Sequence, residues 1–282
     1  MLPAAKYAGC FFVYYWVCHY VCLMVLPFFK KSTKESFTFY SKKLGLTKKN
    51  LSIEKQQEIA LKYFQNFFVT SILSVTHALI MGYLLIPFAL NNYSVLLNAE
   101  ISTTFQDPAV YQAMYIFTGY VLNDFIFMFP YAVEFKLSDD IMFIAHHVTL
   151  IFTWTSFLTD GWGHLFAVPT MLTELTSPFV FVRWVLNEFR MITGNAFLFN
   201  GIFLLIFWYT FRIFGYTFFL SFRLLILRNE IFHPDHLIRN STVLACHILG
   251  CFLQLNWGYL LTMGALKTLG YGQTKPKVEK KN

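Results

Sequence analysis

The sequence predicts an all-α protein that crosses a membrane about seven times. Of its 282 residues, 56% are hydrophobic and only 13% are charged, roughly half the charged share of a typical soluble domain. The apolar residues also gather in runs of about 20, the length that a helix needs to cross a bilayer. We expect spans at residues 8–29, 63–90, 109–133, from 141 onwards, 164–186, 196–220 and 241–266.

The first apolar run, within residues 1–29, is expected to be a retained anchor helix. It lacks the basic start and the small-residue cleavage site of a signal peptide, and it is longer than a signal-peptide core. The six later runs, over residues 63–268, are expected to form a helical unit of their own, with the anchor helix at its periphery.

Basic residues are concentrated in two segments, which predicts the orientation of the chain. Nine lysines lie between Lys30 and Lys62, and five more lie between Lys267 and Lys281. Basic segments stay on the cytosolic side, so we expect the loop 30–62 and the tail 269–282 in the cytosol and the N-terminus in the lumen. Within the loop, Ser52 is expected to cap an amphipathic helical segment. The lysines flank spans without a base-reading pattern, which argues against nucleic acid as a partner.

Each run after the first carries a polar or ionisable side chain at depth. Such groups are costly in lipid, so they should turn inward, toward one another or toward water. We therefore expect six helices around a partly polar cavity that could bind lipid. The alternative is that these groups only join helices, at about 1 kcal/mol for each hydrogen bond. The residues concerned are His77, Asp124, His146, His147, Glu174, Arg212, His247 and Gln254.

The fourth span has the most regular polar spacing. Its polar residues follow one helical face, and His147 lies about 100° away from that face. Thr149 and Thr153 are thus expected to line the cavity. The short turn Gly161–Gly163 then makes the fourth and fifth spans an antiparallel pair. The residues of this face are Asp139, His146, Thr149, Thr153, Ser156 and Asp160.

Two adjacent histidines beside a buried carboxylate could act as general base or nucleophile on a thioester. His146 and His147 are therefore the candidate catalytic residues, and the spacing leaves open whether Asp124 or Glu174 is the carboxylate. Arg212 could hold a carboxylate or a phosphate. The adjacent histidines and the cysteines scattered in apolar runs have no metal-ligand spacing, so no metal and no cofactor is expected.

Four motifs occur in order along the spans: S-x-x-H-A, G-Y-x-x-x-D, H-H and E-L-T-S-P-F-x-x-x-R-W. In this order they resemble the TLC domain, the family that groups the translocating chain-associated membrane protein, the ceramide synthases and the neuronal ceroid-lipofuscinosis membrane protein. The resemblance covers about residues 55–268 and is closest to the subgroup called TLC domain-containing protein 4, or transmembrane protein 56. The motifs lie at Ser74–Ala78, Gly119–Asp124, His146–His147 and Glu174–Trp184.

The resemblance implies a six-helix barrel in the endoplasmic reticulum or another endomembrane, with a link to lipids. Ceramide synthases carry H-H and, further on, H-D-x-S-D. Here His146 and His147 match the first run, whereas Thr173–Ser177 stand in place of the second, with Glu174 as the acidic residue.

These observations lead to one main hypothesis and two alternatives. The main hypothesis is a multi-pass TLC-domain protein that binds membrane lipid in its bundle and influences lipid composition or homeostasis. The first alternative is a ceramide-synthase-like acyltransferase that uses acyl-CoA or sphingolipid-related substrates at His146 and His147; whether the chain is an enzyme stays open, with the unmatched second run against it. The second alternative is a chaperone or cargo receptor for membrane proteins.

Overall fold

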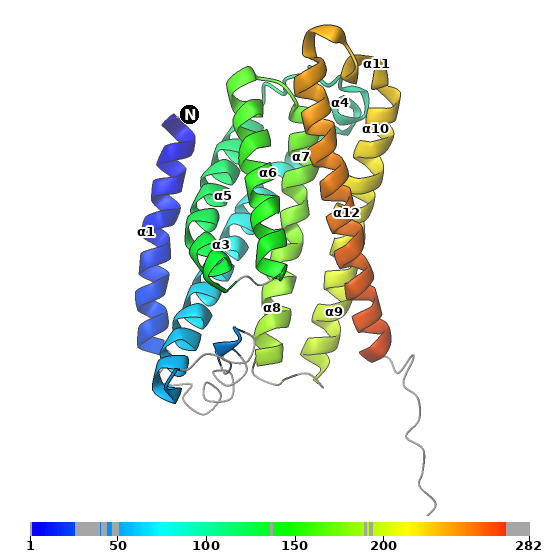
Figure 1. The fold of residues 1–282 in the computed structure, drawn as a ribbon. Coiled ribbons are helices and arrows are strands. Elements are labelled where there is room, and N and C mark those ends of the chain that lie inside the picture. Colours follow the sequence, from blue (N-terminus) through cyan, green and yellow to red (C-terminus); the bar gives the residue numbers. More distant parts are fainter. Residues whose placement is uncertain are drawn as a thin grey trace, which may run out of the picture.

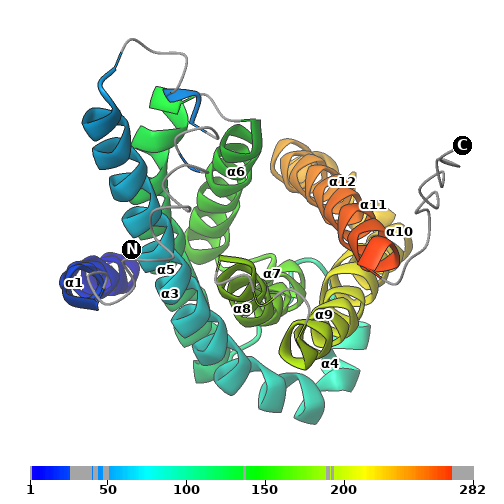
Figure 2. The same cartoon turned by 90° about the horizontal axis from the view of Figure 1, so that it is seen from below.

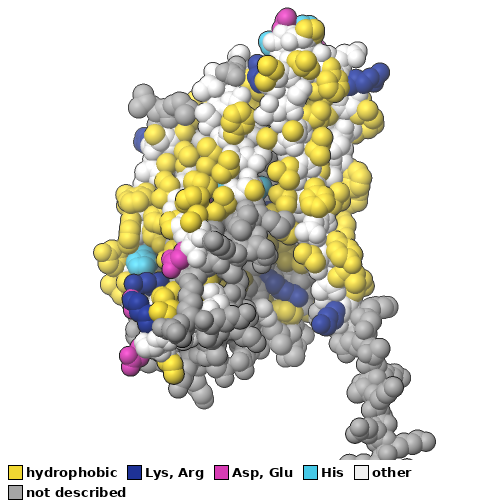
Figure 3. Space-filling model, viewed as in Figure 1, with side chains coloured by type: hydrophobic (Ala, Val, Ile, Leu, Met, Phe, Trp, Pro, Cys, Tyr) yellow, Lys and Arg dark blue, Asp and Glu magenta, His cyan; other side chains and the backbone are white. Residues whose placement is uncertain are grey.

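In a computed structural model, the structure describes residues 2–25, 40, 44–46, 51–135, 138–188, 191 and 194–268. Most of the predicted basic loop and the whole basic tail lie outside this part of the chain, as do the side chains of Asp139 and Asp160. The described residues form helices and no strands, which confirms the predicted all-α class. Hydrophobic side chains cover the flank of the bundle, while charged ones gather toward its two ends (Figure 3). This distribution suits a protein surrounded by lipid.

Helix α1 (Leu2–Val25) lies at the edge of the bundle, beside α3 (Ile53–Asn91) and α5 (Pro108–Phe135) (Figures 1 and 2). The Tyr15 hydroxyl donates to Asn66 Oδ1 on α3 at 2.7 Å. On α5, a Cβ at Gly119 would lie 2.7 Å from the Ala8 backbone nitrogen. The missing side chain at Gly119 therefore lets α1 approach α5 backbone to backbone.

Helix α3 begins at Ile53 rather than near residue 63, so the predicted amphipathic segment and the second span form one helix. The Ser52 hydroxyl accepts the Lys55 N–H at 3.3 Å, as expected of an N-cap. A helix of 39 residues is about 58 Å long, whereas the hydrocarbon core of a bilayer is about 30 Å thick. The first turns of α3, where Glu58 pairs with Lys55 and Lys62, therefore extend beyond the apolar layer.

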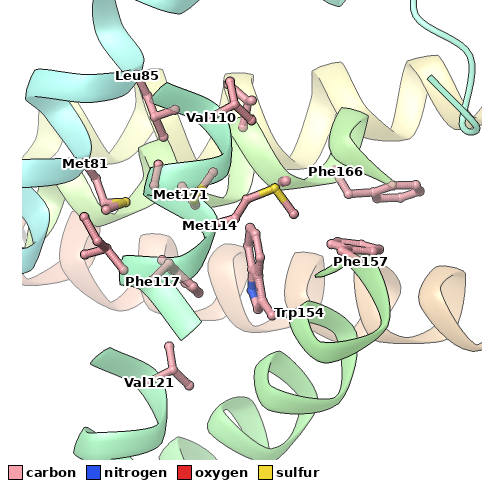
Figure 4. Packing of buried hydrophobic residues seen from close by; sticks show 14 of the residues in the cluster. Met81, Leu85, Val110, Met114, Phe117, Val121, Trp154, Phe157, Phe166 and Met171 are labelled. Atoms are coloured by element: carbon pink, nitrogen blue, oxygen red, sulfur yellow. The ribbon is translucent and has the colours of Figure 1, made fainter. Parts of the chain in front are cut away.

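Helix α6 (Ser138–Asp160) and helix α7 (His164–Leu172) form the expected antiparallel pair. The turn between them contains Gly161 at φ 62° and Gly163 at φ 77°, in the left-handed region that glycine tolerates. A Cβ at Gly163 would also collide with the Phe157 ring. Trp154 and Phe157 on α6 pack with Phe117, Phe166 and their neighbours in the main hydrophobic core (Figure 4).

The predicted fifth span is broken in the middle. It consists of α7, a 3-10 turn η3 (Thr173–Thr176) and α8 (Ser177–Glu188). Pro178 has no N–H to give to the carbonyl four residues back, which is that of Glu174. The Ser177 N–H bonds to the Glu174 carbonyl instead, as in a tighter turn. The sequence thus places the break at Glu174, a candidate site residue.

The sixth span is also irregular. Helix α9 (Asn195–Phe207) continues into a π-helical segment η4 (Trp208–Phe219) and then into α10 (Leu220–Ile226). The last long helix is α12 (Leu237–Thr268). Short helices at the end of the bundle where α6 meets α7 complete the fold: α4 (Tyr93–Asn98), α11 (Arg228–Ile231) and η5 (Pro234–His236).

Within the described residues, five helical stretches are long and apolar enough to cross a membrane. These stretches confirm a multi-pass membrane protein. Helices α5 and α6 are not among the five, so the count of seven spans stays a prediction. The five are Pro3–Met24, Ile53–Asn91, His164–Glu188, Asn195–Ile226 and Pro234–Lys267.

Candidate functional site

A cavity of about 500 Å³ lies between α3, α5, α6, α8, η4 and α12. We call it the lower cavity. Aromatic side chains such as Phe67, Phe181 and Trp184 form much of its wall. Five of the predicted site residues also line it, although they come from four separate segments of the chain: Asp124, His146, His147, Glu174 and Arg212.

The lower cavity contains a buried histidine–carboxylate pair. His147 Nε2 on α6 lies 2.9 Å from Asp124 Oδ2 on α5. The Tyr120 hydroxyl donates to the same carboxylate oxygen at 3.4 Å. The structure therefore identifies Asp124, rather than Glu174, as the carboxylate beside the histidine pair. His146 makes no hydrogen bond to a described residue, and its ring contacts those of His147 and Trp257.

Arg212 joins three segments of the chain around the same cavity. Its Nε donates to the Thr176 hydroxyl on η3 at 2.7 Å, and its Nη1 donates to Gln254 Oε1 on α12 at 3.0 Å. The guanidinium also lies over the Trp208 ring, 4.5 Å from its centroid. Within the described residues, no carboxylate lies within 4 Å of this guanidinium. A buried arginine held by neutral groups keeps donors available for a ligand.

The π-helical backbone of η4 places Arg212 in this position. π-Helical turns are rare and frequently occur at functional sites. Here the buried residues of the segment include Trp208, Arg212 and Tyr216, which share one side of it. The Thr217 hydroxyl donates to the Arg212 carbonyl, five residues back, at 2.9 Å. The Thr217 side chain therefore adds a hydrogen bond to the irregular segment that turns Arg212 inward.

His77 does not line the lower cavity, which corrects its prediction as a lining residue. It is fully buried behind the wall, where its ring stacks on Tyr120 with centroids 4.1 Å apart. Its Nδ1 lies 4.0 Å from Glu174 Oε2, which is too far for a hydrogen bond. Glu174 instead accepts a hydrogen bond from the Ser177 hydroxyl at 3.2 Å.

A smaller cavity of about 50 Å³, the upper cavity, lies between α5, α6, α7 and α12. It contains the other four predicted lining residues: Thr149, Thr153, His247 and Gln254. The Thr149 hydroxyl donates to the Ala145 carbonyl and that of Thr153 to the Thr149 carbonyl, both in their own helix. The stripe predicted to be polar thus has its hydroxyls already satisfied. His247 Nε2 contacts Ser221 Oγ at 3.1 Å and Cys251 Sγ at 3.3 Å.

Several residues of the site were not predicted. Thr176 and Trp208 hold Arg212, and Phe117 and Leu150 line both cavities. Thr176 lies in the E-L-T-S-P motif, so the sequence alone could have indicated it as a site residue. Phe117 and Leu150 stand in apolar runs, where nothing distinguishes a cavity wall from ordinary core. In the part of the chain that the structure describes, no group of three or more His, Cys, Asp or Glu side chains could hold a metal ion.

The fold and the site together define a helical-bundle membrane protein with ionisable groups around a cavity between its helices. The TLC domain matches residues 67–263, which is more than half of the chain. The chain belongs to the TLC-domain family, as its motifs predicted, and it is therefore a membrane protein of a family linked to lipid biology. Comparison with curated proteins gave no match, and comparison with solved structures gave none either.

Proposed function

We propose that the chain binds a membrane lipid in the lower cavity and thereby influences membrane lipid composition or homeostasis. The observation that carries this proposal is the composition of the cavity wall. Aromatic rings lie beside Arg212, Glu174 and the His147–Asp124 pair in a space of about 500 Å³. Such a mixture fits an amphiphile, and ligand sites of this size are typical of small molecules.

The location and orientation belong to the same proposal. We place the chain in the endoplasmic reticulum or another endomembrane, with its N-terminus lumenal and its C-terminus cytosolic. The lysine-rich segments support this orientation. The E-L-T-S-P-F-x-x-x-R-W motif supports a place near the TLC domain-containing protein 4 subgroup within the family.

Filling the lower cavity should expel the lipid. Ser71 lines this cavity, and its hydroxyl donates to the Phe67 carbonyl of its own helix at 2.7 Å. We expect Ser71→Phe to reduce the amount of co-purified lipid at least about tenfold, because overpacking costs more than ~1.4 kcal/mol. The measurement is mass spectrometry of lipid extracted from the purified chain. Leu79→Phe, at a lipid-facing position of the same helix, should keep the lipid; equal lipid in Ser71→Phe and the unaltered chain would contradict the proposal.

A second candidate function is acyl transfer, which the His147–Asp124 pair supports. A carboxylate 2.9 Å from Nε2 orients the ring and stabilises its charged form. In this second candidate function, the imidazole of His147 acts as the general base. It would take the proton from an acceptor amine or hydroxyl, whose attack moves the acyl group from acyl-CoA and releases the CoA thiol.

Asp124→Asn tests this second candidate, since it removes the charge and keeps the shape. We expect acyl transfer to fall by about 10²- to 10⁴-fold. The assay follows transfer from labelled acyl-CoA to sphingoid-base and glycerol-lipid acceptors in proteoliposomes. Tyr120→Phe removes the 3.4 Å hydrogen bond to Asp124 but keeps the carboxylate, and it should keep most activity. If the unaltered chain transfers no acyl group to any acceptor, acyl transfer is excluded while lipid binding stands.

A further inference from the structure

The two cavities are separated by a partition of four side chains. Phe117, His146, Leu150 and Glu174 line both the lower cavity and the upper cavity. His146 and Leu150 lie one turn apart on α6, Phe117 comes from α5, and Glu174 comes from the break between α7 and α8. One half of the partition is therefore ionisable and the other half is apolar.

In the apolar half of the partition, the Phe117 ring packs against two other aromatic rings. The ring centroids of Phe117 and Trp154 are 4.6 Å apart, and those of Phe117 and His77 are 5.2 Å apart. Phe117 is almost fully buried, with 1% of its surface exposed, and Trp154 and Phe117 lie within one packed group of side chains (Figure 4). A ring clamped in this way cannot swing aside easily, since packed cores resist displacement.

Beyond the partition, the wall of the upper cavity offers few hydrogen-bonding groups to a polar ligand, because most of them already bond within the protein. Hydroxyls of Thr149, Thr153, Thr170 and Thr173 donate to carbonyls of their own segments. Gln254 Oε1 accepts from Arg212, and His247 has Ser221 and Cys251 as neighbours. The remaining wall is largely apolar and includes Trp154, Phe157 and Leu253. A hydrocarbon end fits this space better than a head group does.

We infer that the upper cavity receives the terminal carbons of an acyl chain, and that Phe117 and Leu150 set the chain length that the site accepts. This inference rests on the proposed function. The polar part of the lipid would lie in the lower cavity near Arg212 and His147, and the chain would pass between Phe117 and Leu150. The upper cavity measures only about 50 Å³, so it admits a few carbons and excludes longer ends.

The test is the chain-length distribution of lipid that co-purifies with the full chain, measured by mass spectrometry. Leu150→Ala removes the α6 side of the partition and should shift the distribution toward longer chains by about two to four carbons. Thr153→Phe fills the upper cavity and should shift it toward shorter chains. Leu158→Ala is the matched control, because Leu158 is a half-buried residue of the same helix that lines neither cavity. Phe117→Leu, which widens the partition from α5, supplies a second opening variant should Leu150→Ala not fold.

The outcomes distinguish this inference from the proposed function on which it rests. Longer chains in either opening variant, shorter chains in Thr153→Phe and an unchanged profile in Leu158→Ala support the inference. A lipid that is retained with the same chain lengths in both opening variants and the unaltered chain overturns the inference alone. An unaltered chain that holds no acyl lipid overturns the proposed function, and the inference with it.

Discussion

His147→Leu is expected to lower the free energy of unfolding by about 3–5 kcal/mol, because it leaves the Asp124 carboxylate buried without its partner. Asp124 has 3% of its surface exposed. In the native chain, His147 Nε2 lies 2.9 Å from this carboxylate; without it, the described residues offer the carboxylate only the Tyr120 hydroxyl at 3.4 Å. Unfolding of the purified chain in mixed detergent micelles, followed by circular dichroism, measures the change.

A second substitution, at Asp124, should restore most of the stability that His147→Leu loses. In the double variant His147→Leu with Asp124→Leu, the unpaired carboxylate is also removed, so most of the stability should return. His146→Leu is the control, since His146 is the adjacent residue and makes no hydrogen bond to a described residue. It should cost less than about 1 kcal/mol. If His146→Leu and His147→Leu were equally costly, the pair with Asp124 would not be what stabilises this part of the bundle.

The fold class was predictable because the patterns that indicate it extend over long stretches of the sequence. Apolar runs, charge segregation and the Gly161–Gly163 turn gave the helices and the antiparallel pairing of α6 and α7. Boundaries were less predictable. Residues 53–62 were expected to form an amphipathic helical segment of the basic loop, separate from the second span, yet they are the first turns of α3, because Ser52 caps the helix and nothing breaks it before residue 63. The π-helical backbone of η4 left no pattern in the sequence that we could identify.

The site was predictable as a set of residues but not as a geometry. Ionisable residues in apolar runs are few, and most of them turn inward as expected. Sequence spacing within one helix cannot show which carboxylate of another helix meets His147. It also cannot show where a threonine hydroxyl points. The stripe of Thr149 and Thr153 is polar in sequence, whereas its hydroxyls are satisfied by α6 itself, a competition between local and distant partners that only the folded chain decides.

Arg212 links η3 and α12 at the site through two hydrogen bonds. The broken fifth span places Thr176 at η3, the π-helical segment η4 turns Arg212 toward it, and Gln254 on α12 accepts the second hydrogen bond. Two local irregularities, one caused by Pro178 and one in η4, thus converge on a single guanidinium. Regular helices at both places would present different faces to each other, so the irregular backbone and the buried charge depend on each other.

Arg212→Met should therefore destabilise the bundle by about 3–6 kcal/mol, since each hydrogen bond to a charged group is worth about 1.5–3 kcal/mol and two are lost. Arg212→Lys should recover less than half of this, because an ammonium lacks the planar fork that reaches Thr176 and Gln254 together. Arg228→Met is the control: Arg228 is exposed and its side chain, among the residues that the structure describes, bonds only to the Leu225 carbonyl at 3.4 Å, so its loss should change stability by less than about 0.5 kcal/mol. The same unfolding titration measures all three variants. Full recovery by lysine would show that charge alone, rather than the forked geometry joining η3 and α12, is what the bundle requires at this position.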